Sequence, residues 1–107
     1  MSDPVVREFL LAFWKIHILS HAEEGGVHGH WMVEELHRHG YRISPGSLYP
    51  MLHGLEKKGY LLSTGERHGK SLRKVYRATA LGKRALALAK RHVMELLREI
   101  MPEELGR

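Results

Sequence analysis

The chain has 107 residues, which is enough for one domain with a modest core and too few for two domains. It contains no cysteine, so disulfide bonds, thiolate metal sites and cysteine nucleophiles are all excluded. The net charge is +5, yet residues 42–91 alone hold twelve Lys or Arg and two Glu, a net +10 that is typical of a polyanion-binding surface.

Residues 4–23 are predicted to form the first helix, with Ser2 or Asp3 as its cap. Its apolar residues fall on more than one face, so the helix must pack against other apolar surface on most sides, and one small domain rarely supplies that much. We therefore expect part of it to pack against a second subunit. The apolar run is broken by charged residues and is too short to span a bilayer, and the N-terminus lacks the pattern of a signal peptide.

Phe9, Phe13 and Trp14 form an aromatic group on this first helix, and two interpretations remain open. In the first, which we favour, the group fills a dimer contact, because large aromatic side chains dominate such contacts. In the second, it forms a pocket in which a planar aromatic effector stacks between subunits.

Residues 27–59 are predicted to form a helix-turn-helix, that is, two short helices joined by a tight turn. The first of these helices should run from Val27 to His39 and stop at Gly40. We expect it to have an inward apolar face of Met32, Val33 and Leu36 and an outward charged face of Glu34, Glu35 and Arg38.

The second helix of this pair begins at Ser44 and Pro45, because a serine hydroxyl caps free amides and proline fits the first helical position. Helical spacing separates an apolar face from a small, flat one. The apolar face holds Leu48, Leu52 and Leu55 with Met51 at its edge, and the flat face holds Gly46, Pro50, His53 and Lys57, flanked by Ser47 and Gly54. Gly54 costs about 1 kcal/mol relative to Ala, which close approach by a partner would explain. A plain surface helix that tolerates a glycine is the alternative.

Residues 60–78 are predicted to form a β-hairpin with a turn at residues 68–71. It is rich in cations, namely Arg67, Lys70, Arg73, Lys74 and Arg77. A hairpin that follows a helix-turn-helix is a wing, and its tip can lie along phosphates or enter a minor groove. The alternative is a solvated edge hairpin that its charges protect from aggregation.

Residues 79–101 are predicted to form a long last helix capped by Thr79. Apolar residues recur in it at spacings of three and four, namely Leu86, Ala89, Val93, Leu96 and Ile100. Two heptads are marginal alone, but they suffice as one side of an interface with the first helix. The whole chain, residues 1–107, is therefore predicted to be a single mainly α winged helix-turn-helix domain with a two-stranded β wing and a C-terminal dimerisation helix.

Nine histidines raise the question of a metal site. His17 and His21 are four residues apart on the first helix, and His92 with Glu95 lies one turn apart on the last. Neither pair is completed locally by further ligands, and two-ligand spacings arise easily by chance, so no metal or other cofactor is predicted. No spacing suggests a nucleophile or an acid/base pair, so no enzyme is predicted either.

Four motifs carry a resemblance to a known family. They are Val-His-Gly at residues 27–29, Gly-Tyr-Arg-Ile-Ser-Pro-Gly-Ser-Leu-Tyr-Pro-Met-Leu at 40–52, Leu-Glu-Lys-Lys-Gly-Tyr-Leu at 55–61 and Tyr-Arg-Ala-Thr-Ala-Leu-Gly at 76–82. With them the chain resembles the PadR-type transcriptional regulators, in the smaller subgroup with a single C-terminal helix. Three positions depart from the family pattern: Gly54, His30 and Trp31.

The resemblance implies a homodimeric cytoplasmic repressor that binds double-stranded DNA at a palindromic operator. It assigns phosphate contacts to Ser44, Ser47 and Tyr49, base or phosphate contacts to His53 and Lys57, and wing contacts to Arg67, Lys70, Arg73 and Lys74. Dimerisation would use the first and last helices, with Phe9, Phe13, Trp14, Val93, Leu96 and Ile100, and an aromatic effector would bind there as in some relatives.

Two rival functions remain open. One is a winged helix that binds another protein through the Trp31 face and the last helix. The other is a metal-responsive regulator that uses its histidine clusters. The positive charge of residues 42–91 argues against the first, because it predicts affinity for nucleic acid.

Overall fold

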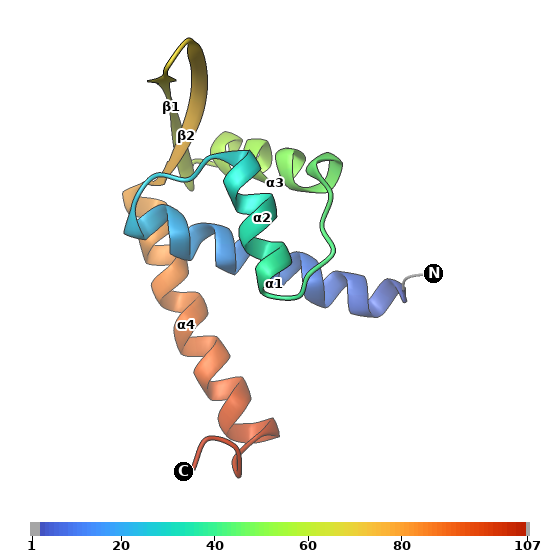
Figure 1. The fold of residues 1–107 in the computed structure, drawn as a ribbon. Helices are drawn as coiled ribbons and strands as arrows, with labels where there is room; N and C mark the ends of the chain where they lie inside the picture. The colour runs from blue at the N-terminus through green and yellow to red at the C-terminus, as the bar shows by residue number, and fades with distance from the viewer. Residues whose placement is uncertain (1–2, 107) are drawn as a thin grey trace.

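The computed structural model describes residues 3–106, which fold into four helices and one antiparallel two-stranded sheet. The elements are, in order, α1 (Pro4–Glu24), α2 (Gly29–Arg38), α3 (Pro45–Lys57), β1 (Leu61–His68), β2 (Ser71–Ala78) and α4 (Ala80–Ile100). The wing, formed by β1 and β2, and α4 project in opposite directions from a body made by α1, α2 and α3 (Figure 1). This arrangement confirms the predicted fold class, a mainly α winged helix-turn-helix.

Three of the four helices begin at a side-chain cap, as the sequence predicts. The Asp3 carboxylate accepts hydrogen bonds from the backbone N–H groups of Val5 and Val6 at 2.8 and 3.2 Å. The Ser44 hydroxyl accepts one from Ser47 N–H at 3.2 Å, and the Thr79 hydroxyl accepts one from Gly82 N–H at 3.0 Å. These local bonds set the starts of α1, α3 and α4.

The start of α2 differs from the prediction, which placed it at Val27. Val27 is instead extended and pairs with Tyr76 of β2, exchanging backbone hydrogen bonds of 3.0 and 2.8 Å. Its side chain is buried, and the helix begins at Gly29. Pairing with the wing satisfies backbone groups that a longer helix would have left at its uncapped end.

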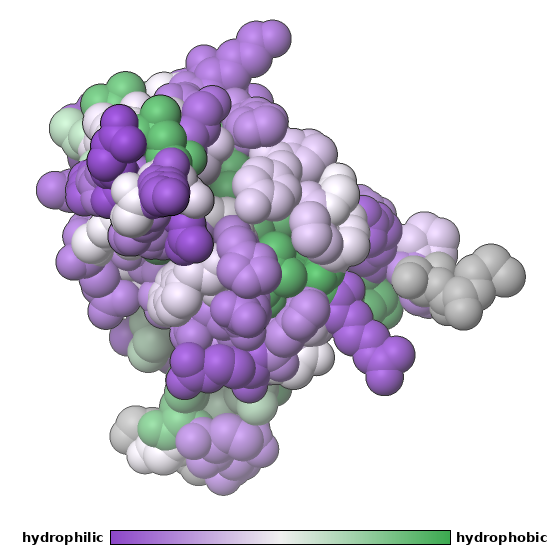
Figure 2. All heavy atoms as spheres, turned by 45° about the horizontal axis from the view of Figure 1, so that its top comes forward, coloured by the Kyte–Doolittle hydropathy of each residue, from purple (hydrophilic) through white to green (hydrophobic). Residues whose placement is uncertain are grey.

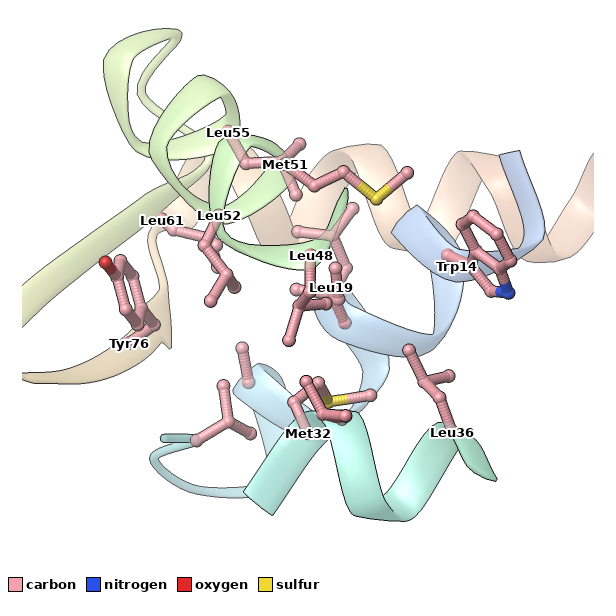
Figure 3. Close-up of a cluster of buried hydrophobic side chains, with 14 of the residues drawn as sticks. Trp14, Leu19, Met32, Leu36, Leu48, Met51, Leu52, Leu55, Leu61 and Tyr76 are labelled. Atoms are coloured by element: carbon pink, nitrogen blue, oxygen red, sulfur yellow. The ribbon is translucent and has the colours of Figure 1, made fainter. Parts of the chain in front are cut away.

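The apolar face of α3 forms the centre of the core, as predicted (Figure 3). Leu48 and Leu52 are fully buried, and Met51 and Leu55 lie at the edge of the same cluster. They pack against side chains from α1, α2 and the base of the wing, including Leu19, Met32, Leu36, Leu61 and Tyr76. The inward face predicted for α2 is confirmed too, since Met32, Val33 and Leu36 are buried.

Trp14 is the main correction to the predicted interface residues. It is 2% exposed and belongs to the core of this one chain, where its ring meets that of Tyr41 edge to face at 6.1 Å. The loop that follows α2 brings Tyr41 to this position, which the spacing within α1 could not indicate. Phe9 and Phe13, in contrast, are 54% and 45% exposed.

The beginning of α4 is held tightly against the start of the wing. A Cβ at position 82 would overlap the carbonyl oxygen of Tyr60, so only glycine allows this approach. Leu86 is buried, and most of the side chains after it are exposed. This second part of α4 runs outward from the body (Figure 1). Within residues 3–106, no helix combines the length and apolar character needed to cross a membrane.

Candidate nucleic-acid interface

The outer face of α3 is exposed, as its sequence predicts. Gly46, Pro50, His53 and Lys57 are all exposed, while the opposite face is buried. The wing lies at the side of α3, so both elements border one face of the molecule. That face is covered mostly by hydrophilic side chains (Figure 2).

Tyr49 crosses from α3 to the start of α2. Its ring lies so close to Gly29 that a Cβ at position 29 would overlap it. The Val-His-Gly motif therefore has a steric role, because the glycine leaves room for the tyrosine. Tyr49 remains 37% exposed, and its ring centroid is 6.4 Å from that of His53, one turn further along α3.

A cleft of about 410 Å³ lies where the start of α2, α3 and the wing meet. It is lined by His28, Gly29, His30, Tyr49, His53, Arg73, Lys74 and Tyr76. Four predicted DNA contacts therefore share one hollow: Tyr49 and His53 from α3, and Arg73 and Lys74 from β2. We call this hollow the basic cleft.

The other predicted DNA contacts lie outside the basic cleft. Arg67 and Lys70 are exposed near the free end of the wing, next to a turn in which Gly69 has a φ of +63°. Lys57 is exposed at the end of α3, and Ser44 lies at its beginning. Ser47 borders a separate groove between α1 and α3, a groove that also contains Arg7, Lys15, Gly54 and Lys58.

The basic cleft also contains His28 and His30 from the start of α2, which were not among the predicted DNA contacts. His28 belongs to the Val-His-Gly motif, and His30 is one of the three departures from the family pattern. The His28 ring meets that of His68 at 5.0 Å, edge to face. Burial lowers the pKa of His28 below its ordinary value, and the nearby His68 and Arg73 lower it further while Glu66 opposes them. His28 is therefore uncharged near neutral pH, and its buried Nδ1 atom has no hydrogen-bond partner among residues 3–106.

Most Lys and Arg side chains of the wing have no acidic ion-pair partner within residues 3–106. Arg77 is the exception, since it pairs with Glu66 at 2.8 Å and donates a hydrogen bond to Thr64 at 3.3 Å across the two strands. Arg67, Lys70, Arg73 and Lys74 have no carboxylate within ion-pair distance in this part of the chain. Their charge is thus available to an external anion.

The predicted interface residues of the long helices are exposed apart from Trp14. Val93, Leu96 and Ile100 follow one another along the outer half of α4. Val5, Val6, Phe9 and Phe13 add exposed apolar area on the first half of α1. Packing between α1 and α4 within the chain covers Leu86 and leaves these two stripes open.

Comparison with known proteins relates this fold to one family. The sequence profile of the "Transcriptional regulator PadR-like family" matches residues 18–88. "Transcriptional regulator Rv3488" of Mycobacterium tuberculosis is 49% identical over 96 residues, which make up 90% of each chain.

Solved structures agree with this relationship. A PadR family transcriptional regulator from Eggerthella lenta is 29% identical and superposes with a TM-score of 0.73, covering 92% of this chain and 90% of that one. A PadR-like transcriptional regulator from Bacillus cereus superposes with a TM-score of 0.82 over 94% of this chain and 99% of that one. Its identity is 24%, so this second likeness shows the fold alone.

Proposed function

This chain belongs to the PadR-like family of transcriptional regulators, and on that premise we propose that it is a cytoplasmic repressor that binds a palindromic operator as a homodimer. The family and the relatives are regulators of transcription and not enzymes. The finer statements, namely repression, the palindrome and the dimer, are supported by the surface of this chain as follows.

The basic cleft is the observation that supports DNA binding most directly. It places the Tyr49 phenol and the His53 imidazole of α3 beside two cations of β2, Arg73 and Lys74. In a duplex, the bare face of α3 would enter the major groove and the wing would follow the neighbouring phosphates. His53 would then face base edges, while Arg73 and Lys74 would neutralise backbone charge.

The first turn of α3 is suited to a further phosphate. The beginning of a helix carries partial positive charge, and the exposed Ser44 begins this turn. We therefore assign phosphate contacts to Ser44 and Ser47. We assign further phosphate contacts, along the same DNA strand, to Lys57, Arg67 and Lys70.

Dimerisation is supported by the two open apolar stripes on α1 and α4. Contiguous apolar surface of this kind marks an interaction site in a soluble protein. A twofold dimer would present two copies of α3, which matches the symmetry of a palindrome. Release by a planar aromatic effector stays a prediction, and because Trp14 is buried it would depend on Phe9 and Phe13.

Selection of bound sequences from a random duplex pool tests this proposal. We expect an enriched motif with twofold symmetry, whose half-sites lie about one helical turn of DNA, or a multiple of it, apart. His53→Ala should change the enriched motif. Lys90→Ala is the control and should leave the motif unchanged, because Lys90 lies on α4 beside Glu23. Absence of any enriched motif, or a motif without symmetry, would contradict the proposal.

A further inference from the structure

Three histidines that are distant in the sequence meet where α1 crosses the end of α2. His17 and His21 lie on successive turns of α1, and His39 follows the last residue of α2. One ring nitrogen from each lies within 4.8 Å of the others. The ring centroids of His17 and His39 are 5.0 Å apart. The sequence paired His17 with His21 but gave no third ligand, and the fold supplies it.

A buried carboxylate lies beside this cluster and contacts two of its three histidines. Glu35 is 9% exposed, so its predicted outward position on α2 is wrong. Its Oε2 atom is 3.1 Å from His39 Nε2 and 3.5 Å from His21 Nε2. Its other oxygen, Oε1, pairs with Arg38 at 3.1 Å, which leaves Oε2 directed at the imidazoles.

We propose that His17, His21, His39 and Glu35 bind one divalent transition-metal ion of the zinc type. Three imidazole nitrogens and one carboxylate oxygen are a donor set that zinc accepts. Zinc–nitrogen bonds of about 2.0–2.1 Å place tetrahedral ligand atoms about 3.3 Å apart. The observed spacing of up to 4.8 Å is wider, so the side chains would rotate towards the ion, and His17 would turn from its 3.3 Å contact with the Tyr41 hydroxyl if it bound through Nε2. Magnesium and calcium prefer oxygen ligands and fit poorly.

The surroundings orient the ligands. Glu24 Oε1 lies 3.4 Å from Nδ1 of His21, the ring nitrogen that faces away from Glu35. A carboxylate in this outer position fixes the orientation of a metal-binding imidazole and increases its basicity. Burial lowers the pKa of His17, as do His39 and His21, while Glu35 opposes them. An unprotonated imidazole is the form that binds a metal.

An ion at this position would join α1 to the end of α2. Both helices belong to the body of the fold, in which α1 carries the open apolar stripe and α2 opens the helix-turn-helix. Metal binding should therefore stabilise the folded chain and raise its melting temperature, an effect that a chelator reverses.

Calorimetric titration of the untagged, chelator-treated protein with zinc chloride tests the site. We expect one ion per chain and an affinity that falls at least about tenfold in His39→Ala and in Glu35→Gln. His92→Ala is the matched control, because His92 is exposed on α4 and should bind no ion. Titration with cobalt(II) gives a second readout, since a tetrahedral nitrogen-rich site produces visible absorption bands that His39→Ala should abolish.

The site would be excluded if the wild-type chain took up no zinc, if His39→Ala bound with unchanged affinity, or if His92→Ala removed the binding. Circular dichroism checks that each variant is folded, which is expected because His39 is exposed and Glu35→Gln keeps the shape of the side chain. The titration needs no DNA, so its result is independent of the function proposed above.

Discussion

The carboxylate of Glu56, in the last turn of α3, accepts two hydrogen bonds from Ser63 of β1, one from the backbone N–H at 2.9 Å and one from the hydroxyl at 2.7 Å. This pair links the helix proposed to enter the major groove to the wing proposed to follow the phosphates. It therefore sets the position of one DNA-binding element relative to the other.

Replacing Glu56 by alanine should destabilise the fold. Hydrogen bonds to a charged group contribute about 1.5–3 kcal/mol when buried, and for this half-buried carboxylate we expect a loss of about 1 kcal/mol near neutral pH. Urea denaturation measures it. Glu99→Ala, an exposed change on α4, should alter the free energy of unfolding much less.

The effect of Glu56 should depend on pH in a defined direction. The two hydrogen bonds from Ser63 lower the pKa of the Glu56 carboxyl below its ordinary value of 4.5, although partial burial opposes them. Its stabilising effect is present above the unfolded-state pKa and is lost as pH falls through the lower folded-state pKa. The stability difference between wild type and Glu56→Ala should therefore shrink in acid, and a difference that grew instead would contradict this account.

Two glycines should respond oppositely to alanine. Gly82→Ala forces a Cβ into the carbonyl oxygen of Tyr60 and should cost at least about 2 kcal/mol, because neither backbone can yield easily. Gly54→Ala places its Cβ in open space within α3 and should stabilise the chain by about 0.5–1 kcal/mol. Thermal denaturation compares them. DNA affinity of the Gly54 variant distinguishes a helix that a partner approaches closely from a plain surface helix.

Salt dependence should report the phosphate contacts. If about six phosphates are neutralised per dimer, log affinity should fall with log salt with a slope of about −5. Lys70→Ala should weaken all sequences alike and reduce the slope by roughly two per dimer, whereas His53→Ala should change the preference among sequences. Fluorescence anisotropy with specific and random duplexes measures both. Equal effects of the two substitutions on both duplexes would refute the assignment of α3 as the recognition helix.

A charge introduced into the exposed apolar stripe of α4 should dissociate the proposed dimer. Leu96→Glu places a carboxylate in an apolar contact, and its burial is unfavourable enough to shift a dimer towards monomers. Leu62→Glu is the control, because Leu62 is even more exposed but lies on the wing. Sedimentation equilibrium at micromolar concentration measures the oligomeric state. A monomeric wild type, or a dimer that Leu96→Glu leaves intact, would remove the proposed interface.

Local interactions made much of this fold predictable from the sequence. The caps at Ser44 and Thr79 act within four residues, and the apolar face of α3 follows from helical spacing alone. The positive charge of residues 42–91 likewise predicts a polyanion-binding surface without reference to the fold.

Long-range contacts decided the rest. Trp14 is buried because it packs in the core cluster, with Tyr41 against its ring, and Val27 is extended because Tyr76 offers it a hydrogen-bonding partner. Glu35 occupies a face of α2 that its pattern marks as outward, yet α1 covers that face and brings His21 to it. Periodicity assigns each helix an inside and an outside, but only the packing of helices against one another determines which polar side chains meet.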